Sequence, residues 1–295
     1  MGNGSFRFGL GEFECVCASD GAFNYPPETF FANAPVERVE EALRRRDLPT
    51  AQITTPYTCL FVDTGRHSVM VDTGAGNLAE HARGIFPGLD HSTTVTGLLL
   101  ENLRAAGIEA SEIDTVVITH AHPDHVGGTL NEAGRLVFDN ARYFIPKDEW
   151  DFWTSDAAAT KAPASMVNTA RKNLEPLRDR LTLVEDETEI VPGIHTVATP
   201  GHTPGHTALT ITSDGERLLH VSDAVLHPLH LEYLEWVPIF DVLPEQAAAS
   251  KRRVFDLAAE ERALVFAHHF PPFPNLGRIL KEGAGWRWHP IETEG

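Results

Sequence analysis

The sequence predicts an α/β fold in which two similar β-rich halves face each other. Apolar and β-branched runs alternate along the chain with amphipathic segments, as in folds whose helices cover sheets. Two predicted hairpins, 58–72 and 208–221, are associated with equally spaced aspartate pairs, Asp63 with Asp72 and Asp214 with Asp223. With 295 residues, 42% of them hydrophobic, the chain can bury a substantial core. Candidate site residues occur in both halves, so we expect a single domain over 1–295.

The remaining elements are predicted in chain order. Residues 1–50 are expected to form an irregular N-terminal extension with one helix at 36–46, whose final arginines suit a helix C-terminus. Further helices are predicted at 92–106, around Trp150, at 164–179 and at 244–259, the last with proline in its first turn. Buried strands outside the hairpins are predicted at 113–118, 141–145, 194–198 and 263–267.

One short segment carries most of the chemical information. His120, His122, Asp124 and His125 follow directly on the apolar strand 113–118. Imidazole nitrogen and carboxylate oxygen are suitable ligands for zinc, iron, manganese and cobalt. In an extended segment, residues two apart point the same way, so His120 and His122 can share one metal. Asp124 and His125 diverge and can serve a second metal nearby.

Further His and Asp side chains stand just past the C-terminal ends of other predicted strands: His202 and His206, Asp223, and the pair His268 and His269. Each of these alone has a structural explanation, such as a helix cap or a turn. Strand ends of one sheet converge in space, however, and polar groups at such ends commonly form a site. Together with the first segment, they predict a metal centre.

These motifs resemble those of the metallo-β-lactamase fold superfamily, and the resemblance extends over residues 58–277. The matching segments are His120-Ala121-His122-Pro123-Asp124-His125, Pro200-Gly201-His202, Asp223, the late histidine pair and Val71-Asp72-Thr73-Gly74. The resemblance implies a four-layer αββα sandwich, in which two mixed β-sheets are flanked by helices. It also implies two divalent metal ions per chain, with zinc expected first and manganese, iron or cobalt as alternatives.

Carried over residue by residue, the resemblance implies a complete ligand set. One metal would be held by His120, His122 and His202. The other would be held by Asp124, His125 and a late histidine, with Asp223 bridging both. His268 is favoured as the late histidine, because this ligand usually follows a small residue at a strand end, and His269 is the less favoured alternative. Asp72 is expected behind the ligands, where it would fix their orientation.

The expected reaction is metal-dependent hydrolysis. Two metals that share Asp223 would acidify a bridging water and polarise the substrate oxygen. Asp124 would orient this water and carry its proton to the leaving group, so Asp124 and Asp223 are the expected catalytic residues.

The segment 268–277 gives the best indication of the substrate. It resembles the Phe-Pro-rich loop of the methyl parathion hydrolase-like branch, which also contains lactonases, although it carries an extra residue after the ligand. This resemblance implies apolar esters, lactones or aryl organophosphates as substrates. The candidate pocket residues are Trp150, Trp153, Phe270 and Phe273. His227 and His230 either touch substrate or belong to a loop.

Composition limits the partners. The net charge of −18 disfavours a polyanion, so no nucleic acid is expected. Three cysteines without a Cys-x-x-Cys pattern indicate neither a disulfide framework nor a zinc knuckle. No run is long and apolar enough for a membrane span, and no leader is evident, so the expected location is cytoplasmic. A homodimer is compatible with the sequence.

The sequence is compatible with several alternative functions. A β-lactamase would normally require export, and a glyoxalase II-type thioesterase would need basic residues near its C-terminus, where Lys281 and Arg287 are available. A flavodiiron-type redox protein is disfavoured by His122, since that group usually has Glu there. A non-catalytic metal-binding scaffold would be expected to lack some of the ligands, and none is missing.

Overall fold

Two β-sheets form the centre of the structure, which is a computed structural model that describes residues 4–76, 94–283 and 285–293. The first sheet has the strand order β1-β2-β3-β4-β6-β7-β8, with β5 paired to β2. Its strands are β1 (Ser5–Leu10), β2 (Phe13–Tyr25), β3 (Ile53–Asp63), β4 (Ser68–Val71), β5 (Val95–Thr96), β6 (Thr115–Val117), β7 (Arg142–Pro146) and β8 (Leu181–Val184). The pairs from β1 to β4 are antiparallel, and those from β4 to β8 are parallel.

The second sheet runs in the order β15-β14-β13-β12-β11-β10-β9. Its strands are β9 (Glu189–Val191), β10 (Ile194–Ala198), β11 (Thr207–Ser213), β12 (Glu216–His220), β13 (Leu264–Phe266), β14 (Leu276–Glu282) and β15 (Gly285–Pro290). Only the β12–β13 pair among these is parallel. Both sheets are therefore mixed.

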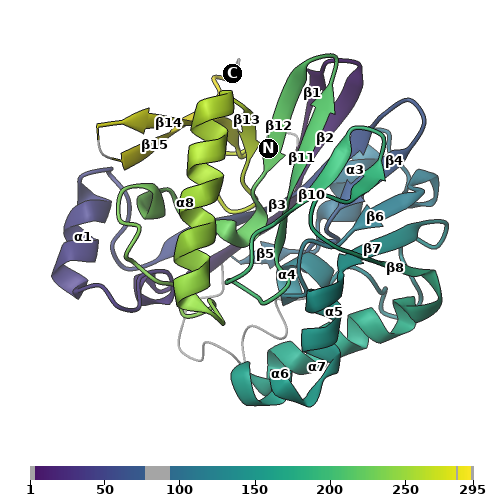
Figure 1. Ribbon diagram of the computed structural model, residues 1–295, viewed down its shortest axis with the longest axis horizontal. Coiled ribbons are helices and arrows are strands. Elements are labelled where there is room, and N and C mark those ends of the chain that lie inside the picture. The colour runs from purple at the N-terminus through teal and green to yellow at the C-terminus, as the bar shows by residue number, and fades with distance from the viewer. Residues whose placement is uncertain (1–3, 77–93, 284, 294–295) are drawn as a thin grey trace.

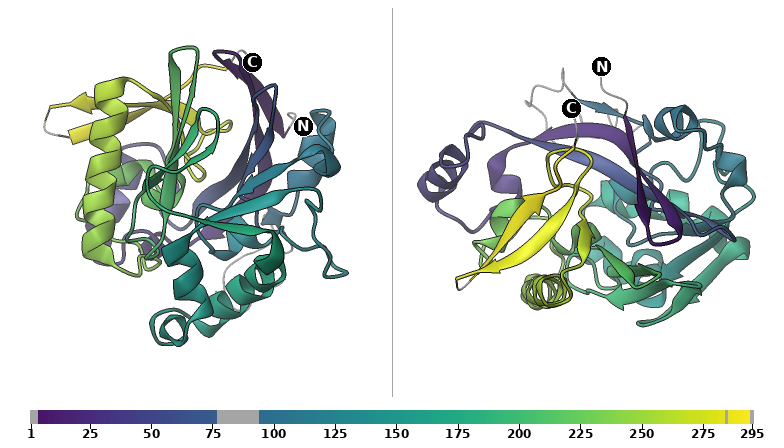
Figure 2. Two further views of the ribbon diagram at one scale, coloured as in Figure 1. Left: turned by 45° about the vertical axis from the view of Figure 1, so that its right-hand side comes forward. Right: turned by 90° about the horizontal axis from the view of Figure 1, so that it is seen from above.

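Helices cover the outer faces of the two sheets (Figures 1 and 2). The covering helices are α3 (Leu99–Ala105), α5 (Lys147–Thr154), α6 (Asp156–Lys161), α7 (Ala164–Leu174) and α8 (Pro244–Glu261). Helix α1 (Val36–Arg44) lies at one edge of the molecule and packs with Phe30 and Trp236, and α4 (Pro123–Val126) is a single turn in the loop after β6. Phe152 of α5 and Leu174 of α7 pack in one core cluster with Val116 of the first sheet. Phe255 of α8 packs against Val265 of the second.

Besides these two clusters between helices and sheets, a further apolar cluster lies between the two sheets. Leu60 and Val71 of the first sheet and Ile194, Leu209 and Phe266 of the second belong to one buried cluster. Apolar faces on both sides of each sheet explain why the strands read as continuous hydrophobic runs. The order helix, sheet, sheet, helix confirms the predicted four-layer αββα sandwich.

The N-terminal segment differs from the prediction. Instead of an irregular extension, residues 1–50 contain β1 and the long strand β2, which pairs with β3 along most of its length. A β-bulge between Ser19 and Gly21 shifts the register of this pairing, so the side-chain alternation that marks a strand changes phase within it. Helix α1 falls inside the predicted range 36–46.

The predicted boundaries of the other helices lie closer to those in the structure. Helix α8 covers the predicted 244–259, and the predicted 164–179 is α7 followed by a 3-10 helix, Glu175–Arg180. Within the predicted helix 92–106, residues 92–93 lie outside the described residues, Val95–Thr96 form β5, and α3 begins only at Leu99. In the described part of the chain, no helix is both long enough and apolar enough to cross a membrane.

Candidate metal centre

The loop after β6 places the first four candidate ligands. Pro123 begins the short helix α4, where its fixed φ suits the first turn and its missing N–H costs nothing. His122 therefore stands at the N-cap, and Asp124 and His125 lie in the turn itself. A Cβ atom on Gly128 would lie 2.0 Å from the carbonyl oxygen of Thr73, so glycine is needed where this loop meets the loop after β4.

Four buried side chains from three loops form the first cluster: His120, His122, His202 and Asp223. Their candidate ligand atoms lie within 4.8 Å of one another. Asp223 Oδ2 is 3.2 Å from His202 Nε2 and 3.6 Å from His120 Nε2. His122 Nδ1 is 2.8 Å from His202 Nε2. This set has the donor types and spacing of a metal site.

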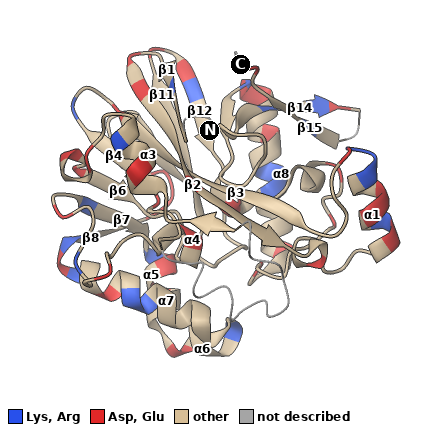
Figure 3. Cartoon of the chain, turned by 180° about the vertical axis from the view of Figure 1, so that it is seen from behind, with Lys and Arg blue, Asp and Glu red and all other residues tan. Residues whose placement is uncertain are grey.

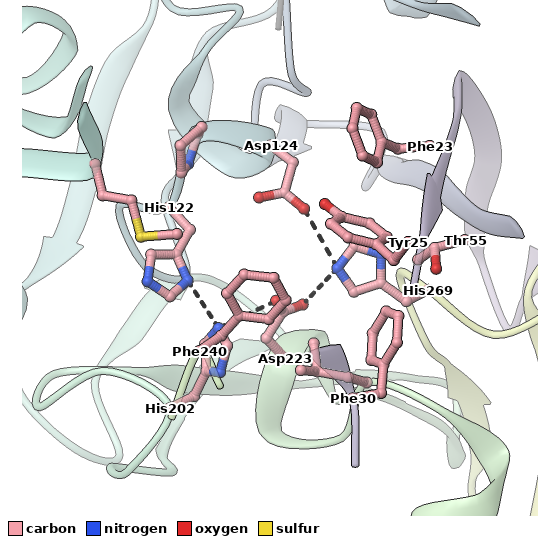
Figure 4. Close-up of a pocket in the computed structure, with 13 residues that line it drawn as sticks. Phe23, Tyr25, Phe30, Thr55, His122, Asp124, His202, Asp223, Phe240 and His269 are labelled. Carbon is pink, nitrogen blue, oxygen red and sulfur yellow. Dashed lines mark hydrogen bonds and ion pairs between the residues drawn. The ribbon is translucent and has the colours of Figure 1, made fainter. Parts of the chain in front are cut away.

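A second cluster lies on the other side of Asp223 and comprises Asp124, His125, His268 and His269. The other carboxylate oxygen, Asp223 Oδ1, is 3.2 Å from His125 Nε2 and 3.3 Å from His269 Nε2. Asp124 Oδ2 is 3.3 Å from the same His269 nitrogen (Figure 4). Asp223 thus presents one oxygen to each cluster, as a bridging carboxylate would.

The two late histidines are placed differently. His269 has Nδ1 3.0 Å from the Pro56 carbonyl oxygen, and a bond donated there fixes the ring with Nε2 toward the two aspartates. Neither ring nitrogen of His268 has a hydrogen-bond partner among the described residues, and its ring lies against that of His125, tilted by 30° with centroids 4.3 Å apart. Of the two, His269 is the one whose Nε2 lies 3.3 Å from both Asp124 and Asp223, whereas the sequence favoured His268.

The donor set fits a pair of metal ions. His120 Nε2, His125 Nε2 and Asp223 Oδ1 are buried and have no hydrogen bond within the described part of the chain. Buried polar atoms without a hydrogen-bond partner are rare, and these three lie in the two clusters around Asp223, so their donor types and positions fit metal ions. Burial lowers the pKa of His120, with His125 adding to the effect, and burial and His202 lower the pKa of His122 to about 3. Both rings are thus neutral, the form that binds metals.

Carboxylates behind the ligands orient the imidazoles. Asp72, in a left-handed conformation with φ 61°, accepts a 2.8 Å bond from His125 Nδ1 and bonds from the amide and hydroxyl of Thr119. Asp241 accepts a 2.9 Å bond from His202 Nδ1. In each case the bond leaves Nε2 to face the cluster, as ligand-orienting groups do. The sequence pointed to Asp72 for this position but gave no sign of Asp241.

His206, the second histidine of the repeated Pro-Gly-His, has a different role from His202. Its Nε2 accepts a 3.1 Å bond from the backbone N–H of Asp223, and its Nδ1 is 2.7 Å from the Thr199 hydroxyl. Both nitrogens are thus used, and the ring positions the backbone of the bridging residue.

Glu149 on α5 joins the two ligand loops and was not anticipated from the sequence. Its side chain is fully buried and accepts bonds from the backbone of Ala121, between His120 and His122, and from the Thr203 hydroxyl beside His202. Gly205 N–H and Trp153 Nε1 donate to the same carboxylate. A lone Glu on a predicted helix carries no sequence signal for such a role.

A pocket opens onto both clusters. Its lining residues include His122, Asp124, His202, Asp223 and His269 (Figure 4). The rest of the lining consists of Phe23, Tyr25, Phe30, Thr55, Pro123, Met166, Leu226 and Phe240. Several of these come from the N-terminal residues that were predicted to be irregular, which is why the sequence did not reveal them.

The four aromatic residues proposed for the pocket from the sequence are not in this lining. Trp153 is buried behind His122 and donates to Glu149, and Trp150 lies against Arg178. Phe270 packs against Trp288, and Phe273 packs against the core between the sheets. His230, left open above, is buried with Nε2 3.0 Å from the carbonyl oxygen of the pocket residue Phe30.

Comparison with known proteins agrees with this geometry. A family model described as the metallo-beta-lactamase superfamily matches residues 54–269. The N-acyl homoserine lactonase AiiA of Bacillus thuringiensis subsp. kurstaki is 27% identical over 232 residues, which cover 75% of this chain and 84% of the relative. The beta-lactamase-like protein 2 homolog of Caenorhabditis elegans is 28% identical over 261 residues, which cover 84% of this chain and 74% of the relative.

Two solved structures superpose over nearly the whole chain. AidC, described as a dizinc quorum-quenching lactonase in complex with a product, has a TM-score of 0.88 at 27% identity and covers 99% of both chains. The hydrolase AbOPH has a TM-score of 0.86 at 24% identity, with complete coverage of both. The chain belongs to the metallo-beta-lactamase superfamily. Within that superfamily it is a metal-dependent hydrolase with two candidate metal sites of His and Asp residues.

Proposed function

We propose that this hydrolase opens uncharged lactones, with N-acyl homoserine lactones as the first substrates to test. The observation that carries the proposal is the double cluster of His and Asp around Asp223, which faces an aromatic pocket. The similarity to AiiA and AidC supports the lactone. Apart from the candidate ligands, the described residues that line the pocket bear no charge. An uncharged substrate suits such a wall, because a buried charge needs a partner.

The proposed ligands are His120, His122 and His202 for one metal, Asp124, His125 and His269 for the other, and Asp223 for both. Zinc is the proposed metal, supported by the imidazole nitrogen and carboxylate oxygen donors and by the dizinc description of AidC. Two such ions would supply Lewis acidity to a hydrolytic water and to the substrate carbonyl.

The protein residues have separate roles in this proposal. The backbone N–H of Asp223 is held by His206, and the two carboxylate oxygens of Asp223 would bind one metal each. Asp124 lines the pocket, and its side chain is 13% exposed against 4% for Asp223. It is therefore the carboxylate best placed to take the proton from the attacking water and to return it to the leaving alkoxide.

Esters and aryl organophosphates are a second candidate class, favoured by the phenylalanine rings of the pocket wall. The β-lactam and glutathione thioester alternatives have less support, since their carboxylates would find no Lys or Arg among the described lining residues. In Figure 3 the Lys and Arg positions are scattered among Asp and Glu rather than gathered over one element, as a nucleic-acid site would require. A homodimer remains an expectation.

The test combines metal analysis with a substrate panel. About two zinc ions per chain are expected, together with chelator-sensitive hydrolysis of an acyl-homoserine lactone. An aryl ester, an aryl phosphotriester, a cephalosporin and a glutathione thioester complete the panel. A protein that binds no metal and hydrolyses none of these substrates would overturn the proposed hydrolase function in favour of a scaffold role. Preferential hydrolysis of the thioester or the cephalosporin would overturn the assignment of lactones as the substrate class.

A further inference from the structure

The pocket wall opposite the α4 loop is built from β2 and β3. Phe23 pairs with Thr55 across these strands, and paired residues share one face of a sheet. Tyr25 and Tyr57 lie two positions from this pair on their respective strands, so they belong to the same face. The opposite face carries Asn24, whose side chain accepts a bond from Thr54.

Two hydroxyl groups interrupt the apolar lining. Tyr25 and Thr55 provide the only side-chain hydroxyls among the described residues that line the pocket, and no Lys, Arg, Asn or Gln accompanies them. The Thr55 side chain is buried, and its oxygen has no hydrogen-bond partner in the described part of the chain. An unsatisfied buried hydroxyl in a pocket wall is a feature that a ligand can complete.

The Tyr25 hydroxyl is positioned by a second tyrosine. The hydroxyl groups of Tyr25 and Tyr57 are hydrogen-bonded to each other, and Tyr57 is fully buried with its ring edge-on to His269 at 5.3 Å. In Figure 4 the hydroxyl end of Tyr25 is directed toward Asp124.

We propose that Tyr25, held by Tyr57, and Thr55 form a subsite that hydrogen-bonds the amide of an N-acylated lactone. An amide offers one acceptor and one donor, and hydroxyl groups can serve both. Phe23, Phe30 and Phe240 on the surrounding wall would receive the acyl chain. The subsite rests on the proposed lactonase function and deepens it, because it predicts preference for acyl amides over lactones that carry only an alkyl chain.

The experiment compares kcat/KM for N-hexanoyl homoserine lactone and for a γ-lactone with an alkyl chain of matched length. In Thr55→Val and in Tyr25→Phe, both nearly isosteric, the preference for the amide substrate is expected to fall about three- to tenfold, mainly through KM. Tyr57→Phe should cause a smaller loss of the same kind. Tyr143→Phe is the matched control, since this buried hydroxyl donates to the Phe138 carbonyl in another cluster.

The possible outcomes separate the two proposals. A wild-type enzyme that hydrolyses neither lactone overturns the proposed function and the subsite with it. A wild-type enzyme that hydrolyses both without preference, or variants that lower both rates equally, overturns the subsite alone. Zinc content and thermal unfolding of every variant identify a folding defect. If Tyr25→Phe does not fold, Thr55→Val and Tyr57→Phe decide the question by the same ratio.

Discussion

Glu149→Ala is expected to weaken both the fold and the metal centre. The variant removes a carboxylate that accepts bonds from Ala121 N at 2.8 Å, Trp153 Nε1 at 2.5 Å, Thr203 Oγ1 at 2.6 Å and Gly205 N at 3.1 Å. All four donors are buried, and each donor left without an acceptor costs about 1–3 kcal/mol. Burial raises the pKa of Glu149, so removal of the carboxylate also relieves a desolvation penalty that offsets part of this loss.

The net destabilisation is expected to be about 3–5 kcal/mol, because the relieved desolvation of the carboxylate offsets part of the cost of four donors left without an acceptor. The loop cannot easily move to compensate, because Gly205 already lies against the backbone: a Cβ there would be 2.0 Å from Glu149 N. In a domain of this size the midpoint of thermal unfolding should fall by about 5–10 °C. Zinc affinity should fall about 10- to 100-fold, because both ligand loops lose an anchor.

Glu149→Gln and Asp151→Ala complete the test. The glutamine retains one acceptor oxygen but directs an NH2 group at Gly205 N–H, so a loss of about 1–2 kcal/mol is expected. Asp151, on the same helix, pairs with Lys147 at the surface, and its removal should change stability by less than about 0.5 kcal/mol. Stability is measured by thermal and urea unfolding, and zinc affinity by competition with a chelator. The reasoning is refuted if Glu149→Ala matches Asp151→Ala in both.

Three further predictions concern single residues. His269→Ala should lose one of two zinc ions, while His268→Ala should retain both in elemental analysis; the opposite result would restore the preference drawn from the sequence. Asp72→Asn should lower kcat/KM about 10- to 100-fold by loosening His125, as measured beside its zinc content, and an unchanged rate would contradict this role. Burial raises the pKa of Asp20 from 3.8 to about 6, against its bonds from Ala75 N and Leu99 N. Because the folded state then binds the proton more tightly, stability relative to Asp20→Asn should fall by about 1–2 kcal/mol between pH 5 and pH 7 in urea unfolding, and no such change would refute it.

The fold and most of the candidate ligands could be predicted because local sequence determines them. His120, His122 and Asp124 lie on one short loop after a buried strand, and the proline of α4 fixes the turn between them. His202 and Asp223 likewise follow strands of the second sheet. In α/β folds, binding residues commonly lie in the loops at the carboxyl ends of the strands. A motif that follows a predicted strand therefore indicates where its side chains lie in the fold.

The late histidine could not be decided in this way. His268 and His269 are adjacent in the chain. Which of the two side chains points toward Asp223 depends on the backbone conformation of the loop after β13. The hydrogen bond from His269 Nδ1 to the Pro56 carbonyl oxygen fixes the orientation of the His269 side chain. Pro56 belongs to β3, which is far away in the chain. A sequence pattern contains no record of such a long-range contact.

The pocket wall escaped prediction for a related reason. In β2 the register shift at Ser19 and Gly21 breaks the period-two alternation by which strands are identified. Phe23 and Tyr25 therefore resembled an irregular segment rather than the inner face of a sheet.

Three buried carboxylates support the candidate site, and only one of them could be identified from the sequence. Asp72, Glu149 and Asp241 each tie a ligand or a ligand loop to a separate element: the end of β4, α5 and the loop before α8. The candidate ligands lie on loops that these buried anchors hold in place, so the proposed metal ions would bind with little reorganisation. Only Asp72 belongs to a recognisable motif, since it follows β4 directly. The other two act across the fold, so their roles follow from the tertiary structure.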